Sequence, residues 1–427
     1  MRTECGEIVR TGVLLVGVDT GEETDFERSM EELASLAEAA EREVAGVIVQ
    51  RMEAVNKALY IGTGKVAEVR EYAGQCGAEE VIFDNALSPS QVRNLGRELE
   101  LPVLDRTNLI LDIFALRART GEAKLQVETA RLQYMLPRLV GMRENLSRQG
   151  GAGGSMSSKG AGETKLELDR RKIEHRISEL KKELAAVAKN RETMRKKRSQ
   201  SKIPQVALVG YTNAGKSTIM NRLVEKYGDN REKTVLEKDM LFATLDTSVR
   251  AIRTEDNRPF FLVDTVGFLH KLPHGLIRAF QSTLEEVKYA DLLVQVVDFS
   301  DERYRQHMEV TEETLKELGA GGIPQIIVFN KADRCGLQDI PRRKGDQVYV
   351  AAGKDCGLEE LVEMIQERTY AERVEEVFLL PFEKGGLVSY FMENATVLEQ
   401  EYQEDGVKLK VSCHRSDAEK YKAYLCH

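Results

Sequence analysis

Paired cysteines and long apolar runs are both missing from this 427-residue sequence. The six cysteines lie far apart, and none stands in the spacing that zinc sites and disulfide frameworks use. No stretch approaches the roughly eighteen apolar residues that a membrane span needs, and the opening residues MRTECGEIVR lack the apolar core of a secretion signal. We therefore expect reduced thiols, no membrane span and a cytoplasmic protein.

Charge is unevenly spread along the sequence. The formal net charge is −8, yet the stretch from Lys165 to Lys202 holds fourteen Lys/Arg against six Asp/Glu. This local balance of +8 leaves −16 for the remainder. The length predicts two to four domains, and hydrophobic residues, at 42%, have an ordinary globular share. The sequence thus indicates a folded acidic protein with one basic arm.

The first part of the chain, residues 1–120, alternates strand-like apolar runs with helical stretches. Apolar runs cover 13–18, 44–49 and 81–83, and helical patterns cover 26–40 and 89–99. This alternation predicts a small α/β domain with a partly parallel sheet. Inside it, the glycines and lysine of Gly62-Thr63-Gly64-Lys65 are compatible with a phosphate contact. The pattern is too short to be specific, and it favours a turn or a helix start.

Residues 121–202 show the spacing of two long helices. Apolar side chains recur every seven residues from Leu125 to Leu139 and again from Leu166 to Met194, which predicts a helical hairpin. A glycine-rich loop, about 149–162, joins them. Glycine disfavours regular structure, so the loop is either a flexible linker or a segment that orders on an RNA partner. Arg148, Lys159 and Lys165 lie in or beside it.

The basic arm that ends the second helix has two interpretations of equal weight. Charge runs usually form a solvated helical face, but clustered Lys/Arg also give the electrostatic attraction by which proteins bind phosphate backbones. No aromatic residue is interleaved from Lys189 to Arg198, so base stacking is not implied.

Residues 203–370 repeat the order strand, helix, strand. Apolar runs at 206–209, 260–263, 292–297, 326–329 and 348–351 predict a doubly wound sheet. The final part, 371–427, has strand-like runs around a helical stretch and a turn at Asp405-Gly406, which predicts a small α+β domain.

A phosphate-binding loop follows the strand at 206–209 and precedes a helical run. It has the GxxxxGKS spacing, whose glycines let backbone N–H groups surround phosphates at a helix N-terminus. Its lysine faces the β- and γ-phosphates, and its serine hydroxyl suits Mg²⁺. The residues are Gly210, Tyr211, Thr212, Asn213, Ala214, Gly215, Lys216 and Ser217, with Thr218 next in the helix.

Two further motifs end apolar strands in the order expected of a GTPase. Asp264, followed by Thr265, Val266 and Gly267, can hold Mg²⁺ through water and offer a glycine N–H to the γ-phosphate. In Asn330-Lys331-Ala332-Asp333, the Asp333 carboxylate can accept two hydrogen bonds from guanine. Adenine offers no such pair, so the sequence predicts GTP over ATP.

Softer assignments surround this core. Thr244 is expected to complete the magnesium shell, with an ordinary strand threonine as the alternative, and a backbone amide of Ala351 or Ala352 is expected to meet the guanine oxygen. The predicted catalytic set is therefore Lys216, Thr244 and Gly267. Phe268 stands where many GTPases place a glutamine that orients water. We expect slow turnover that a partner or a monovalent cation such as K⁺, held by Asn213, stimulates.

Taken together, these motifs resemble the HflX family of translation-associated GTPases. The resemblance rests on the phosphate loop, Leu-Phe-Ala-Thr-Leu-Asp from Leu241, Asp-Thr-Val-Gly-Phe from Asp264, the glycine-rich loop and Gly162-Glu163-Thr164 running to Arg170 and Arg171. It implies a four-part chain, Mg²⁺-dependent GTP hydrolysis and binding to the large (50S) ribosomal subunit. It also implies contact of the loop region with ribosomal RNA, splitting of idle or stalled ribosomes and, for some members, ATP use by the N-terminal domain. We expect a monomer.

The sequence departs from the family pattern at three positions. Ala351 replaces a usual serine, Thr247 a usual proline, and Lys165 a common glutamine. The first two put guanine affinity and switch geometry in doubt. A ribosome assembly or silencing factor, in which GTP only sets ribosome affinity, is the alternative function. An RNA-modifying enzyme is disfavoured because no cysteine or acidic constellation supports that chemistry.

Overall fold

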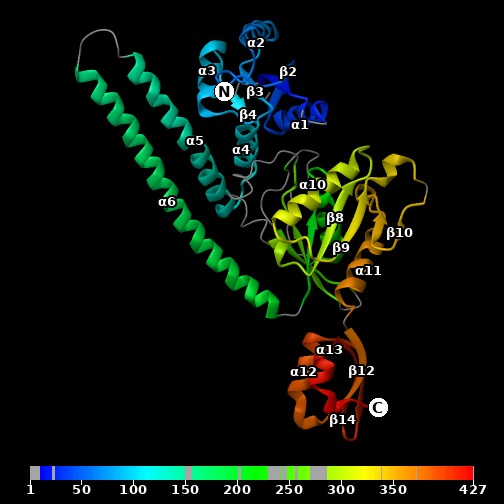
Figure 1. Ribbon diagram of the computed structural model, residues 1–427. Helices are drawn as coiled ribbons and strands as arrows, with labels where there is room; N and C mark the ends of the chain where they lie inside the picture. The colour runs from blue at the N-terminus through cyan, green and yellow to red at the C-terminus, as the bar shows by residue number, and fades with distance from the viewer. Residues whose placement is uncertain are drawn as a thin grey trace, which may run out of the picture. The chain divides into compact units, whose positions relative to one another are not determined.

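The computed structural model divides the chain into two compact units, which are described separately (Figure 1). The first is built mainly on the chain up to Lys189, and the second on the chain from Asn190. The structure describes residues 10–21, 25–149, 156–200, 203–228, 242, 248–254, 258–269, 286–337, 339–371 and 373–426. No helix within these ranges combines the length and the hydropathy that crossing a bilayer requires.

The first unit begins with a four-stranded parallel sheet of order β2-β1-β3-β4. The side chains of β1 alternate between the two faces of the sheet. On one face, Leu14, Val16 and Val18 join a core cluster with α2 and α3. On the other face a Cβ at Gly17 would collide with Phe26 and Met30 of α1, so α1 packs closely there. The elements are β1 (Thr11–Asp19), α1 (Phe26–Ala39), β2 (Arg42–Arg51), α2 (Thr63–Cys76), β3 (Glu80–Phe83), α3 (Pro89–Leu99), β4 (Val103–Asp105) and α4 (Arg106–Arg117).

This parallel sheet confirms the predicted small α/β fold. The motif at Gly62 is the N-terminus of α2, since Gly62 is the N-cap and Lys65 pairs with Glu68 at 2.7 Å. The predicted helix start is therefore what the residues form.

Two long helices follow, α5 (Gly121–Gln149) and α6 (Met156–Gln200), as the seven-residue repeats predict. They run antiparallel in Figure 1, and the guanidinium of Arg176 pairs with Glu128 at 2.8 Å. The glycine-rich loop is shorter than predicted, because Met156 to Gly162 belong to α6. Each helical glycine costs about 1 kcal/mol relative to alanine, but extending an existing helix adds one hydrogen bond per residue fixed.

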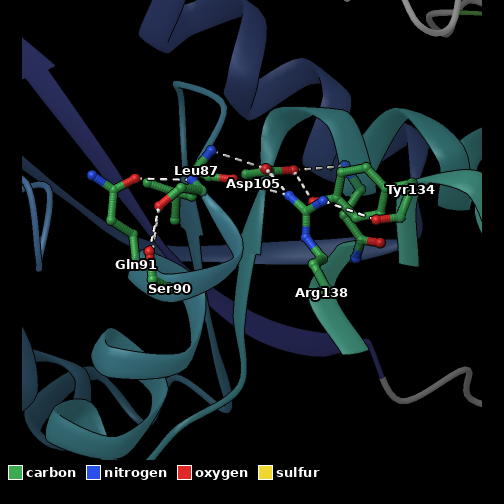
Figure 2. Close-up of polar contacts among 8 residues, drawn as sticks. Leu87, Ser90, Gln91, Asp105, Tyr134 and Arg138 are labelled. Carbon is green, nitrogen blue, oxygen red and sulfur yellow. Dashed lines mark hydrogen bonds and ion pairs between the residues drawn. The ribbon is translucent and has the colours of Figure 1, made fainter. Parts of the chain in front are cut away.

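Asp105 ties the sheet to the helical hairpin (Figure 2). Its fully buried carboxylate ends β4 and caps α4 by accepting from the Asn108 N–H at 2.9 Å. It also accepts from the Leu87 N–H, from the Tyr134 hydroxyl and from the Arg138 guanidinium, the last at 3.0 Å. Burial, and then the Asp105 charge, raise the pKa of Tyr134.

The second unit contains a seven-stranded sheet of order β10-β11-β9-β8-β5-β7-β6. The five strands from β11 to β7 are parallel, which confirms the doubly wound fold. The elements are β5 (Gln205–Val209), α7 (Lys216–Tyr227), β6 (Ser248–Ile252), β7 (Phe260–Asp264), β8 (Leu292–Asp298), α10 (Tyr304–Glu317), β9 (Gln325–Asn330), β10 (Arg342–Lys344), β11 (Gln347–Tyr349) and α11 (Leu358–Thr369). Short 3₁₀ turns η1 (Ala332–Cys335) and η2 (Ala352–Lys354) follow β9 and β11.

The chain ends in a three-stranded antiparallel sheet of order β12-β14-β13 with its own core. The rings of Phe378 and Phe391 pack at a tilt in that core, with 4.6 Å between their centroids. This is the α+β arrangement that the sequence predicts for the last part. Its elements are β12 (Arg373–Leu380), η3 (Phe382–Lys384), α12 (Gly385–Asn394), β13 (Thr396–Gln403), β14 (Gly406–His414), α13 (Arg415–Lys420) and η4 (Lys422–Tyr424).

Asp105→Asn should loosen the junction between the sheet and α5. The amide would present a donor to groups that are themselves donors, and breaking a buried pair of this kind costs about 3 kcal/mol. We expect faster amide hydrogen exchange in peptides covering Asp105 to Arg138 of the full chain, and unchanged exchange in β5. Asp169→Asn, which changes the same charge at an exposed position of α6, is the control. Equal exchange in Asp105→Asn and the unmodified chain would refute the role of this carboxylate.

Candidate functional site

The phosphate loop connects β5 to α7, where two glycines are required by geometry. Gly210 and Gly215 have φ of +140° and +94°, values that L side chains rarely adopt. A Cβ at Gly210 would lie 2.2 Å from the Val296 carbonyl oxygen, and one at Gly215 would lie 2.1 Å from Nδ2 of Asn330. The loop can therefore wrap closely only with glycine at both positions.

Lys216 begins α7 and turns its ammonium back into the loop. Its Nζ donates to the carbonyls of Gly210 and Tyr211, at 3.0 and 2.7 Å. The side chain is buried, and this burial lowers the pKa of Lys216 to about 8, against a smaller opposite effect of Asp264. A phosphate beside this ammonium would raise the pKa of Lys216 again, because an anion favours the charged form.

Ser217 and Asp264 lie side by side at the phosphate loop and carry oxygen donors that suit a metal ion. The Ser217 hydroxyl donates to Oδ2 of Asp264 at 2.9 Å, and Asp264 is fully buried at the end of β7. A hydroxyl and a carboxylate are the hard oxygen donors that Mg²⁺ takes alongside phosphate and water. Within the described ranges no group of three His, Cys, Asp or Glu residues forms a metal cluster. The residues present thus fit a cation completed by a nucleotide.

The segment after β7 is tied to the phosphate loop through its backbone. The Thr212 N–H donates to the Phe268 carbonyl at 2.9 Å, and the Phe268 N–H donates to the Gly210 carbonyl at 3.1 Å. A Cβ at Gly267 would lie 2.7 Å from Cα of Thr212, so only glycine allows this approach. The Phe268 ring is buried and carries no polar atom that could orient water.

Asn330 joins the phosphate loop to the last loop of the site. Its buried amide donates to the Ala214 carbonyl at 2.9 Å and accepts from the Ala352 N–H at 3.1 Å. Lys331 adds a second connection, because its Nζ donates to the Asn213 carbonyl at 2.9 Å and pairs with Asp298 at 2.7 Å. Two adjacent side chains from the end of β9 therefore contact two consecutive carbonyls of the phosphate loop.

Asp333 lies in η1, and its carboxylate pairs with Lys354 at 3.0 Å. The hydrogen bond from Lys354 lowers the pKa of Asp333. The Ala351 N–H donates to the Cys356 carbonyl at 3.0 Å, while that of Ala352 is bonded to Asn330. Both amides predicted to meet guanine have partners in this structure, and their role stays a prediction.

Of the remaining residues that the sequence analysis names at this site, three are described by the structure and two are not. Thr265 is buried and donates from Oγ1 to the Leu208 carbonyl at 2.6 Å, a contact that fixes the strand end. Val266 is buried beside it, and Thr218 lies in the first turn of α7. Thr244 and Thr247 lie outside the described residues. Phe242, in the same predicted switch segment, is buried and packs edge-on against Phe114 of α4 within the first unit, at 4.8 Å between centroids.

The predicted RNA-contact residues belong to the helical hairpin. Arg148 is in the last turn of α5, and Lys159 and Lys165 are in α6, where their side chains lie outside the described part. Arg170 and Arg171 pair within α6 with Glu174 and Glu167, at 2.9 and 3.3 Å. The side chains of these two arginines are 43% and 70% exposed and lie on the same stretch of α6.

Three contacts at the site involve residues that sequence reasoning missed. Asp298 ends β8 between the two other motif-bearing strands, and that position was the available signal. Lys354 follows Ala351 by three residues, and only the structure shows that it reaches Asp333. His307 of α10 stacks on the Tyr211 ring at 4.0 Å between centroids, and no sequence signal predicts this contact.

Comparison with known families agrees with the order of these motifs. Three family profiles match in succession: a GTP-binding GTPase N-terminal region over residues 27–115, a GTP-binding GTPase middle region over 117–198, and a 50S ribosome-binding GTPase over 205–331. The third covers the phosphate loop, Asp264 and Asn330.

Relatives extend the likeness over nearly the whole chain. The GTPase HflX of Caldanaerobacter subterraneus is 43% identical and covers 91% of this chain and 88% of its own length. The GTPase HflX of Escherichia coli is 40% identical, with 93% and 92% covered. A solved structure described as an SsGBP and GDP complex is 27% identical with a TM-score of 0.46, over 84% of this chain and 98% of that one. On its sequence relatives, this chain belongs to the HflX family of GTPases and hydrolyses GTP.

Proposed function

We propose that this GTPase binds the large ribosomal subunit and uses its GTP cycle to split or recycle idle or stalled ribosomes. The observation that carries the proposal is likeness to HflX relatives over more than nine tenths of the chain. The profile that matches residues 205–331 is described as a 50S ribosome-binding GTPase. Ribosomal RNA and GTP or GDP are the proposed partners.

The basic helix α6 provides the surface for RNA. It contains most of the stretch from Lys165 to Lys202, whose local balance is +8 in a chain of net charge −8. Among the described residues, Arg170 and Arg171 form exposed ion pairs within the helix. Such pairs contribute little in water, so a phosphate backbone can replace the glutamates without a large penalty. Arg148, Lys159 and Lys165 would extend this contact around the end of the hairpin.

The nucleotide roles follow from the geometry of the loops. Backbone amides of the phosphate loop and the Lys216 ammonium would hold the phosphates, and the Asp333 carboxylate would accept from guanine. Ser217 and Asp264 would hold Mg²⁺, with Thr244 from the switch segment. When bound, Mg²⁺ neutralises charge that develops on the phosphate oxygens.

Hydrolysis is proposed to be slow in the isolated chain. Phe268 supplies no acceptor for the attacking water, so another group must orient it. Asn213, at the exposed end of the phosphate loop with φ of +60°, is placed to help hold K⁺ between the phosphates. The Gly267 N–H would meet the γ-phosphate.

The second candidate is a ribosome assembly or silencing factor in which GTP only sets affinity. The departures at Ala351 and Thr247 from the family pattern bear on guanine affinity and on the geometry of the switch segment. The two candidates share subunit binding and differ only in whether subunits separate.

Nucleotide binding should take up a proton above pH 8. Lys216 is largely neutral there in the nucleotide-free protein, since its pKa is about 8, and phosphate would recharge it. At pH 8.5 we expect net proton uptake when GDP binds, measured by titration calorimetry in buffers of different ionisation enthalpy. At pH 7 the ammonium is already charged, so the same measurement serves as the control. Absence of proton uptake at pH 8.5 would contradict the recharging of Lys216 by phosphate.

The same shift predicts how stability depends on pH. The unfolded chain binds more protons than the folded one between pH 8 and 10.5. The Lys216 contribution to the free energy of unfolding therefore rises with pH across that window.

The chain should pellet with 50S subunits, more strongly with a non-hydrolysable GTP analogue than with GDP. The double variant Arg170→Glu/Arg171→Glu should weaken pelleting, because it reverses two charges on the proposed RNA face. Lys181→Glu/Lys182→Glu changes the same charge three turns further along α6 and should weaken it less. Failure to pellet in both nucleotide states would exclude subunit binding.

Light scattering with whole ribosomes then separates the two candidate functions, since only a splitting factor lowers the scattering signal with GTP.

A further inference from the structure

Lys354 and Asp333 lie on two short turns that the fold holds at fixed separation. The Ala332 N–H donates to the Val350 carbonyl at 3.1 Å, and the Ala352 N–H donates to the Asn330 side chain at 3.1 Å. These bonds connect the turn that follows β9 to the turn that follows β11. Buried groups thus set the placement of one turn against the other, independently of any surface side chain.

The turn that carries Lys354 is also closed on itself. Ala351 and Cys356 exchange two backbone hydrogen bonds, at 3.0 and 3.2 Å, around the four residues between them. The Lys354 N–H donates to the Ala351 carbonyl at 2.9 Å inside this turn. Lys354 therefore starts from a fixed backbone position, and its ammonium reaches Oδ2 of Asp333 at 3.0 Å.

We propose that Lys354 is an intramolecular competitor for guanine, whose ammonium occupies the Asp333 carboxylate until the base displaces it. The inference rests on the proposed role of Asp333 in reading the base. Guanine must offer its N1–H and its exocyclic amine to both oxygens of this carboxylate, and the ammonium holds one of them with the same kind of donor. The base and the Lys354 ammonium therefore compete for the Oδ2 oxygen of Asp333.

Exposure limits the size of the effect. The Lys354 side chain is 69% exposed and that of Asp333 is 23% exposed, so the pair is of the surface kind, which typically contributes up to about 1 kcal/mol. Releasing the carboxylate from it would strengthen nucleotide binding by about two- to fivefold. The ammonium leaves before the base enters, so we assign the effect to the association rate.

Lys354→Met tests the proposal, because it removes the ammonium and keeps an unbranched side chain. With a fluorescent GDP analogue and the full chain, we expect affinity to rise about two- to fivefold through faster association, with dissociation unchanged. The difference between the two proteins should shrink in high salt, which screens the exposed pair. Lys344→Met, which removes an exposed lysine of β10 in the same sheet, is the control and should bind as the unmodified chain does.

Two outcomes overturn the proposal. Unchanged affinity of Lys354→Met means that the pair does not compete with the base. Faster dissociation means that Lys354 contacts the bound nucleotide instead.

The Asp333→Asn variant distinguishes a failure of the Lys354 proposal from a failure of the base-reading role of Asp333. That variant should prefer xanthosine diphosphate, and in it Lys354→Met should have no effect, since no carboxylate remains to compete for. If Asp333→Asn keeps its preference for guanine, the base-reading assignment itself is wrong.

Discussion

The buried amide of Asn330 is the contact on which the arrangement of the nucleotide site depends. One side chain from the end of β9 donates to the phosphate loop at Ala214 and accepts from the last loop at Ala352. An amide satisfies both partners at once, whereas a carboxylate or an apolar group would leave one buried group unpaired. The loops that would meet phosphate and base are thereby fixed as one body, and Lys331 repeats the connection at Asn213.

Strand ends and glycine positions were predictable from the sequence because they follow from local rules. Apolar runs at 206–209, 260–263 and 326–329 located β5, β7 and β9, and a motif after each run lies at the same edge of a parallel sheet. The helical hairpin followed from its seven-residue repeats in the same way. The glycine-rich loop is shorter than its composition predicts, because composition does not show that a neighbouring helix can propagate through glycine.

Contacts between distant segments were not predictable. Nothing near Lys354 in the sequence marks it as a partner of Asp333, since the two meet only when β11 pairs with β9. Asp105 likewise acquires its role from Tyr134 and Arg138, which belong to α5 and lie about thirty residues further along the sequence. The roles of Thr244 and the four-part division of the chain remain predictions.

GDP affinity of Asn330→Asp tests the central claim most directly. The substitution keeps the shape of the side chain and its contact with the Ala352 N–H, but it turns an acceptor toward the Ala214 carbonyl. We predict that GDP affinity falls about tenfold or more, the cost of leaving a buried carbonyl without its donor. Preference for guanine over xanthine should persist, because Asp333 is untouched. Equal GDP affinity in the variant and the unmodified chain would contradict the claim that Asn330 holds the site together.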